Sequence, residues 1–131
     1  MYFYFLSHRE DDIPMKAAQI AQLLEAEVYT GKDQLDMDIL TAFSGDMMSD
    51  VLAFPKENMV LLTGLLNTQV MRTCEMLDIH CVVFVRGKKP SDDILEMAEE
   101  NEITVMSTSS GMYVSSGILY SNGLNAIKRG I

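Results

Sequence analysis

Three short, uninterrupted apolar runs recur in the second half of this 131-residue chain, at residues 59–63, 81–85 and 103–106. Between successive runs lies a stretch with helical spacing of its apolar residues and room for one helix. A strand buried on both faces has such a continuous apolar run, whereas a half-exposed strand alternates. Connections of this strand–helix–strand kind are right-handed crossovers between parallel strands. The sequence therefore predicts an α/β fold, a three-layer α/β/α domain with a mostly parallel sheet and a βαβαβ C-terminal half.

The remaining elements follow from periodicity and from helix signals. Residues 15–26 carry Ala17, Ile20, Ala21 and Leu24 at the spacing of an amphipathic helix. Further expected elements are strands at 27–30 and 39–44, a helix at 46–54 with Met47, Met48, Val51 and Leu52 inside, a helix at 68–77, a helix with Ser91 as its N-cap, and a last helix at 112–119.

Composition is that of an ordinary globular protein. Hydrophobic residues make up 48% and charged residues 22% of the chain, which excludes a disordered chain, and the length suits one domain. The net charge of −9 argues against nucleic-acid binding and against docking on an anionic membrane. No apolar run approaches the roughly 18 residues that span a bilayer. Cys74 and Cys81 lie in apolar runs, so we expect buried, reduced thiols in a cytoplasmic protein.

The chain divides into one domain and two short ends. Residues 1–14 open with an aromatic stretch at 2–6, without the basic region and the cleavage site of a secretory signal. We expect them to be either an N-terminal extension upstream of a start at Met15 or a short strand at a sheet edge. The domain then covers residues 15–124, and the small, basic tail at 125–131 is expected to fray.

Candidate ligand-binding residues follow the three buried runs. The carboxyl ends of parallel strands meet at one edge of a sheet, where open α/β sheets bind their ligands. The residues at these ends are Gly64, then Arg86, Gly87 and Lys88, then Ser107, Thr108 and Ser109. The basic middle loop, together with hydroxyls and backbone N–H groups at a helix N-terminus, favours an anion such as phosphate. The alternative is that the basic loop is a solvated turn and that the serine and threonine side chains are helix caps.

Other chemistries lack the residues that they need. A phosphate-binding P-loop requires a glycine five residues before Gly87, where Val82 stands. Neither a histidine pair nor a Cys-x-x-Cys is present, so we expect no metal site. Asp46 and Asp50, one helical turn apart, are expected to be a helix cap and a solvated side chain. Because no nucleophile or acid–base pair converges, we expect no catalytic residues and no cofactor.

Several of these segments together resemble the DRTGG domain family over the span from Met15 to about Leu124. The resembling segments are residues 15–21, 49–52, 61–64, 83–90 and 103–108. The chain has Gly-Leu-Leu-Asn at 64–67 where members have Asp-Arg, and Val-Arg-Gly at 85–87 where they have Thr-Gly-Gly, while Pro90 persists. The resemblance implies an α/β fold similar to the N-terminal domain of HPr kinase. It also implies a regulatory role, since such domains accompany CBS domains in some pyrophosphatases and precede the catalytic part of some phosphotransacetylases.

The residues and the resemblance together predict a non-catalytic regulatory module that senses a small phosphate-bearing ligand such as a nucleotide. The alternative is a protein-interaction or dimerisation subunit that binds a partner protein and no small molecule. We expect a homodimer, because a small domain gains much stability from association. The candidate contact faces are residues 2–6, the helix with Met47 and Met48, and the last helix with Met112, Tyr113, Leu119 and Tyr120.

Overall fold

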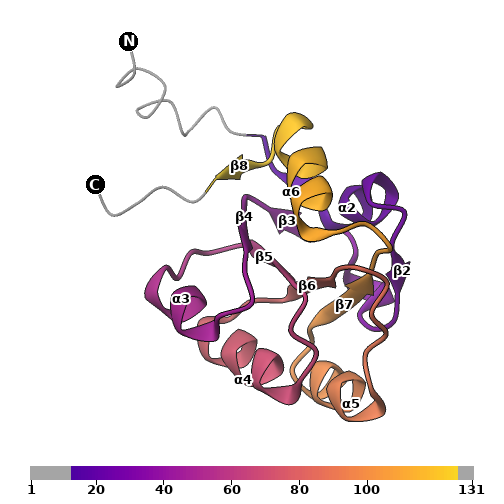
Figure 1. The fold of residues 1–131 in the computed structure, drawn as a ribbon, viewed down its shortest axis with the longest axis vertical. Coiled ribbons are helices and arrows are strands. Elements are labelled where there is room, and N and C mark those ends of the chain that lie inside the picture. The colour runs from indigo at the N-terminus through magenta and orange to yellow at the C-terminus, as the bar shows by residue number, and fades with distance from the viewer. Residues whose placement is uncertain (1–12, 127–131) are drawn as a thin grey trace.

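The computed structural model describes residues 13–126, and a six-stranded sheet forms its middle layer (Figure 1). In spatial order the strands are β2 (Glu27–Val28), β7 (Thr104–Ser107), β6 (Cys81–Phe84), β5 (Met59–Thr63), β4 (Thr41–Ser44) and β8 (Asn125–Ala126). β2 runs antiparallel to β7, and every other pair of neighbours is parallel. The sheet is therefore mostly parallel, as the sequence predicted.

The three central strands are the three apolar runs of the sequence. β5 pairs in parallel with β6, and β6 pairs in parallel with β7. Side chains on both faces of these strands have no exposed surface, among them Val60, Leu62, Val82, Phe84 and Val105. The prediction of adjacent, parallel, fully buried strands is confirmed.

Helices cover both faces of the sheet (Figure 1). α3 (Met48–Ala53), α4 (Thr68–Leu77) and α5 (Asp92–Glu100) lie on one face, and α2 (Ala17–Leu23) and α6 (Met112–Ser121) lie on the other. Successive strand residues contribute to opposite cores: Leu61 and Phe84 pack with α3–α5, whereas Leu62 and Val83 pack with α2 and α6. Since both faces of each central strand are covered, its sequence has no polar alternation.

Side-chain caps start the two helices that connect the central strands. The Asn67 side chain accepts a hydrogen bond from the Gln69 N–H at 2.9 Å at the start of α4. The Ser91 hydroxyl accepts one from the Ile94 N–H at 3.4 Å at the start of α5. Ser91 is thus the N-cap that the sequence predicted.

The N-terminal helix is shorter than the predicted span of 15–26. Met15–Lys16 form a strand, β1, which pairs antiparallel with β3 (Asp38–Ile39) in a separate two-stranded sheet. α2 therefore begins at Ala17, and it ends before Glu25, which has a left-handed φ of 49°. The prediction was wrong at both ends because pairing with a distant strand displaces the first helical turn and a left-handed residue closes the last one.

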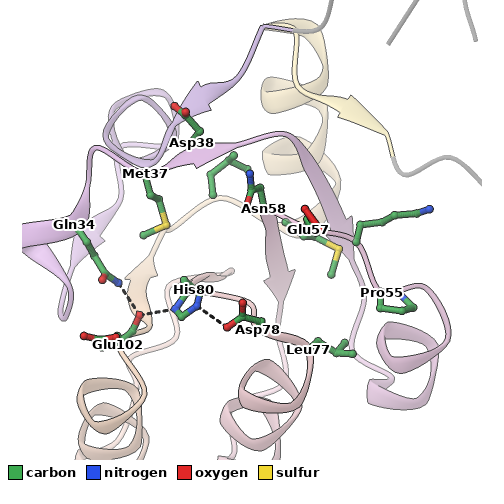
Figure 2. Close-up of a pocket in the computed structure, with 13 residues that line it drawn as sticks. Gln34, Met37, Asp38, Pro55, Glu57, Asn58, Leu77, Asp78, His80 and Glu102 are labelled. Atoms are coloured by element: carbon green, nitrogen blue, oxygen red, sulfur yellow. Dashed lines mark hydrogen bonds and ion pairs between the residues drawn. The ribbon is translucent and has the colours of Figure 1, made fainter. Parts of the chain in front are cut away.

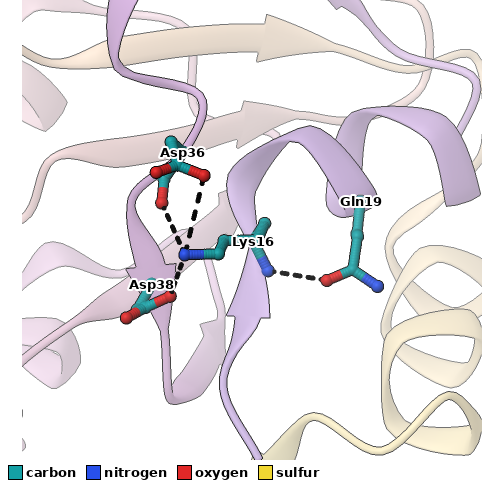
Figure 3. A network of polar contacts seen from close by, with 4 residues as sticks. All are labelled: Lys16, Gln19, Asp36 and Asp38. Carbon is teal, nitrogen blue, oxygen red and sulfur yellow. Dashed lines mark hydrogen bonds and ion pairs between the residues drawn. The ribbon is translucent and has the colours of Figure 1, made fainter.

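Polar contacts of Lys16 hold this strand-to-helix junction together (Figure 3). The Lys16 backbone N–H donates to Gln19 Oε1 at 3.0 Å, which occupies one of the unpaired donors at the helix start. Lys16 Nζ lies 2.8 Å from Asp38 Oδ1 and donates to the Asp36 carbonyl oxygen at 3.0 Å. The hydrogen bond to Asp38, with the nearby charges of both aspartates, raises the pKa of Lys16.

Two other predicted elements differ in extent. The predicted strand at 39–44 is divided at Leu40 between β3 and β4, because β3 belongs to the smaller sheet. The predicted helix at 46–54 is the six-residue α3, in which Met48 and Val51 are buried. Met47 and Leu52 were predicted to lie inside but are exposed, because so short a helix turns only residues three apart toward the core.

Some predictions fall outside the described residues. The aromatic stretch at 2–6 and the end of the tail lie in residues 1–12 and 127–131, so the expected edge strand and the expected fraying stay predictions.

A short 3₁₀ turn, η2 (Lys32–Gln34), connects β2 to β3. Within residues 13–126 no helix is long and apolar enough to cross a bilayer.

Phe84 offers a direct test of the two-sided core. Truncation of this fully buried ring to alanine should lower the free energy of unfolding by about 3–5 kcal/mol, through lost burial and the cavity left behind. Urea unfolding measures the change. Met76→Ala, at an exposed position of α4, is the control and should shift it by less than about 0.5 kcal/mol. Equal effects of the two variants would contradict the packing described here.

Candidate functional site

The carboxyl ends of β4, β5, β6 and β7 meet at one edge of the sheet, and Gly64 lies at the centre of their contacts. Its N–H donates to Asp46 Oδ1 at 2.7 Å, and its carbonyl oxygen accepts from Lys88 Nζ at 2.9 Å. Asp46 Oδ1 also accepts from the Thr63 hydroxyl at 3.0 Å. Side chains from the loops after β4 and β6 thus hold the backbone that follows β5.

The Arg86 guanidinium lies directly against the Cα of Gly64. A Cβ built on Gly64 would fall 2.6 Å from Arg86 Nη2 and 3.0 Å from its Cζ. Gly64 does not have a left-handed backbone conformation, so its missing side chain serves close approach rather than a special φ. The absence of a side chain at Gly64 therefore allows Arg86, which follows β6, to lie against the main chain that follows β5.

Arg86 and Gly87 form a left-handed turn, with φ of 63° and 69°. Their N–H groups donate to the carbonyl oxygens of Ser110 and Thr108, both at 2.8 Å. A left-handed arginine is uncommon, and these bonds to the loop after β7 hold it there. The turn aims the Arg86 side chain back toward β5.

Two of the three hydroxyls predicted to bind a ligand donate hydrogen bonds within the protein. The Ser107 hydroxyl donates to the Lys88 carbonyl oxygen at 2.5 Å, and the Thr108 hydroxyl donates to the Leu24 carbonyl oxygen at 2.7 Å. Both side chains are buried, whereas Ser109 is exposed. The Ser107 and Thr108 side chains therefore hold the loops at this edge in place, while Ser109 is exposed to solvent.

The N-terminus of α6 lies beside these loops. Gly111 is its N-cap and provides no side-chain hydrogen bond, so the first-turn N–H groups carry the positive end of the helix dipole without a side-chain cap. The Ser44 and Ser116 hydroxyls, 2.6 Å apart, tie the end of β4 to this helix. The bond from Arg86 N–H to Ser110 then places the arginine next to the helix start.

The electrostatics of this edge are unbalanced. Within residues 13–126 no carboxylate lies at ion-pair distance from Arg86 or Lys88, although Asp46 is close by. The Asp46 carboxylate instead accepts from the Gly64 N–H and the Thr63 hydroxyl. Two cations and a helix N-terminus thus remain available to an anion.

Contacts join six of the seven predicted ligand-binding residues: Gly64 contacts Arg86 and Lys88, Ser107 bonds to Lys88, and Gly87 bonds to Thr108. Sequence analysis missed Asp46, which it interpreted as a helix cap. The parallel register pairs Ser44 with Leu62, which sets position 46 beside position 64. The contact between Asp46 and Gly64 could therefore be predicted only from the register of β4 against β5, which the sequence alone does not show.

A cavity of about 880 Å³ lies at the opposite, amino edge of the sheet (Figure 2). Four loops far apart in sequence line it, and its lining includes Met37, Asn58, Asp78, His80 and Glu102. His80 is fixed there by Glu102, whose carbonyl oxygen lies 2.9 Å from Nδ1, and by Asp78, whose Oδ1 lies 2.8 Å from Nε2. This cavity was not predicted from the sequence, because no single segment forms it.

Both cysteine thiols are buried. Burial raises the pKa of Cys74 and of Cys81 to about 12, so both are protonated at neutral pH. Both are buried free thiols, as predicted. Among residues 13–126 no group of three His, Cys, Asp or Glu side chains is placed to hold a metal ion.

Comparison with known proteins agrees with the resemblance read from the sequence. The family model for the DRTGG domain matches residues 19–121. The chain belongs to the DRTGG domain family. No match was found among curated proteins.

A solved structure shares the fold of this DRTGG domain. It is the CBS and DRTGG region of the regulatory part of a Clostridium perfringens pyrophosphatase, complexed with its activator diadenosine tetraphosphate. The TM-score is 0.66 at 18% identity, over 87% of this chain. This DRTGG domain matches 54% of the length of that chain, so the two share a fold over part of the larger protein. Both segments that depart from the family's Asp-Arg and Thr-Gly-Gly pattern lie at the carboxyl edge, as residues 64–67 and 85–87.

Gly64→Ala tests the close approach of Arg86 in this DRTGG domain. The added Cβ would overlap the mobile end of the Arg86 side chain and no backbone atom, so the guanidinium should move while the fold persists. We expect a change of less than about 1 kcal/mol in the free energy of unfolding, with a large change in the NMR signal of Arg86 Nε–H. A loss of several kcal/mol would instead mean that Gly64 is needed by the backbone.

His80 predicts a pH dependence of stability. The hydrogen bond to the Glu102 carbonyl oxygen and, less strongly, that to Asp78 raise the pKa of His80 above its ordinary value of 6.5, against the lowering effect of burial. The folded state binds the proton more tightly than the unfolded state, so this contribution is complete below pH 6.5 and is lost as pH rises through the folded pKa. His80→Gln should flatten the decline in unfolding free energy above pH 6.5, as measured by urea unfolding at a series of pH values, and the exposed control Met76→Gln should leave that decline unchanged.

Proposed function

We propose that this DRTGG domain is a non-catalytic regulatory module that binds a small phosphate-bearing ligand, such as a nucleotide, at the carboxyl edge of its sheet. The observation that carries the proposal is the convergence of Arg86 and Lys88 on Gly64, with no carboxylate of the described residues at ion-pair distance. In a chain of net charge −9, such a local excess of positive charge favours an anionic ligand.

Several groups at this edge could bind a phosphate, each through a different interaction. The planar Arg86 guanidinium suits two parallel hydrogen bonds to phosphate oxygens, and Lys88 adds a point charge. The first-turn N–H groups of α6 and the exposed Ser109 hydroxyl offer further donors. Gly87, Ser107 and Thr108 then act indirectly, since their bonds shape the loops.

The same geometry argues for binding without catalysis. The hydroxyls of Ser107 and Thr108 are committed to backbone carbonyl oxygens, and no base adjoins them among the described residues. His80 lies at the amino edge, on the far side of the sheet from Arg86. The buried thiols remain protonated. A nucleophile next to a base, which chemistry on a bound ligand needs, is therefore missing from this edge.

The similar structure supports a regulatory role and suggests the first probes. That protein region is regulatory and holds a dinucleotide with four phosphates as its activator. A ligand with several phosphates would engage Arg86 and Lys88 together. The buried, reduced thiols Cys74 and Cys81 fit a cytoplasmic protein, which we include in the proposal.

A protein-interaction or dimerisation subunit without a small ligand is the second candidate. The observation that favours it is the exposed apolar and aromatic surface of α6, where Tyr113, Val114 and Tyr120 are uncovered in the described part of the chain. The two functions differ in whether a nucleotide binds at all.

Paired substitutions test the phosphate site. Wild-type protein should be stabilised against heat by diadenosine tetraphosphate, ATP or another polyphosphate ligand, by about 2.7 kcal/mol at a concentration one hundred times the Kd. Arg86→Ala with Lys88→Ala should abolish this shift. It should change the melting temperature of the free protein little, because exposed charges contribute roughly 0–1 kcal/mol each to folding. Differential scanning fluorimetry and calorimetric titration measure both effects.

The matched control removes the same charge elsewhere. Lys56→Ala with Arg72→Ala changes two exposed cations away from the carboxyl edge, and the ligand-induced shift should persist. If the control abolishes binding equally, general electrostatics explain the effect and the site is wrong. If no polyphosphate ligand stabilises the wild-type protein, the interaction subunit replaces the regulatory module as the better description.

A further inference from the structure

The two helical layers differ sharply in charge. α2 and α6, on one face of the sheet, contain no Asp, Glu, Lys or Arg. On the other face α3 carries Asp50, α4 carries Arg72 and Glu75, and α5 carries five acidic residues. A water-facing helix normally has a charged stripe opposite its apolar one, so α6 lacks the usual signature of a solvated surface.

α6 is apolar on its outward side as well as on its inward side. Leu119 and Ser115 face the core, while Tyr113, Val114 and Tyr120 are 91%, 52% and 70% exposed. Tyrosine is enriched and charged residues are depleted at the centres of protein–protein interfaces. This combination, on ten successive residues of one helix, is typical of a surface that is covered in the assembled protein.

Gly117 lies at the middle of this outward side. It is one helical turn after Tyr113 and nearly one turn before Tyr120, and a Cβ added to it would meet nothing within 4 Å. A glycine inside a helix costs about 1 kcal/mol relative to alanine, and nothing within the described residues requires it. Close approach of another helix from outside would require it.

We propose that the outer face of α6 is the contact between two copies of this chain, packed about a twofold axis with the two helices crossing at Gly117. Two copies that each carry a charge of −9 repel one another, and a contact through α6, which has no charged residue, brings the fewest charges together. In a twofold contact the same patch faces itself, so tyrosines of each copy flank the glycine of the other.

The available area fits this contact. Each exposed tyrosine can bury about 150–250 Å², and the two copies bring four tyrosines to the crossing. Together these supply roughly half of the 1,200–2,000 Å² that a stable interface buries. Neighbouring Val114 and Ser121 and the uncharged α2 extend the patch. The other exposed apolar patch, Met47, Leu52 and Phe54, is interrupted by the exposed carboxylate of Asp50.

Disulfide trapping tests the crossing directly, without any ligand. Helix axes about 8–10 Å apart, with Cα atoms about 2.3 Å from each axis, leave facing Cα atoms near the separation that a disulfide spans. Gly117→Cys should therefore form a covalent dimer under mild oxidation, seen on a non-reducing gel. Cys74 and Cys81 are buried with a pKa of about 12, so they give no background. Met76→Cys, exposed on α4, is the control and should stay monomeric.

A bulkier residue should have the opposite effect. Gly117→Gln has open space in the single chain and improves helix propensity, so the melting temperature of the separated chain should not fall. By sedimentation equilibrium the dissociation constant of the dimer should rise by at least about tenfold, which corresponds to 1.4 kcal/mol. Met76→Gln should leave the dissociation constant unchanged.

Several results would overturn the proposal. A full-length chain that sediments as a monomer of 14.7 kDa at high micromolar concentration would overturn it. A dimer that persists with Gly117→Gln and is not trapped by Gly117→Cys would place the contact elsewhere. Both measurements use ligand-free protein, so they stand or fall independently of the phosphate site.

Discussion

Burial of β5, β6 and β7 on both faces is the constraint from which the rest of the molecule follows. Each of these strands must be covered by helices on two sides, so the chain has to return to the same edge of the sheet after every strand. Parallel strands then end together. As a result the loops that follow β4, β5, β6 and β7 meet in space, although they are spread from residue 45 to residue 111 in the sequence.

Where these loops meet, the main chain at Gly64 positions the charged side chains. Gly64 is bonded through its N–H to Asp46 and through its carbonyl oxygen to Lys88, and its bare Cα lies under Arg86. A carboxylate and two cations thus meet at one residue, and the carboxylate oxygen Oδ1 accepts from the Gly64 N–H and the Thr63 hydroxyl. The hydroxyls of Ser107 and Thr108 complete the arrangement from behind by holding the loops in place.

The sequence predicted those parts of the structure that local pattern determines. The buried strands, the helix between each pair, and the cap at Ser91 all depend on residues close together in the chain. Predictions failed where a distant partner decides the outcome. Pairing of β1 with β3 replaced the first turn of the expected helix by a strand. Asp46 was expected to cap a helix, but the parallel register of β4 with β5 places it where it accepts a hydrogen bond from the Gly64 N–H. The amino-edge cavity around His80 was not predicted, since four separate loops create it.

At one edge the sheet ends in β2, a strand of only two residues. So short an edge strand exposes few unpaired backbone groups, and β2 also runs antiparallel to β7, the strand beside it. The β2 edge therefore offers few backbone groups to which a strand from a neighbouring molecule could bond. Because the central strands are continuously apolar, a short edge of this kind limits edge-to-edge aggregation on that side of the sheet.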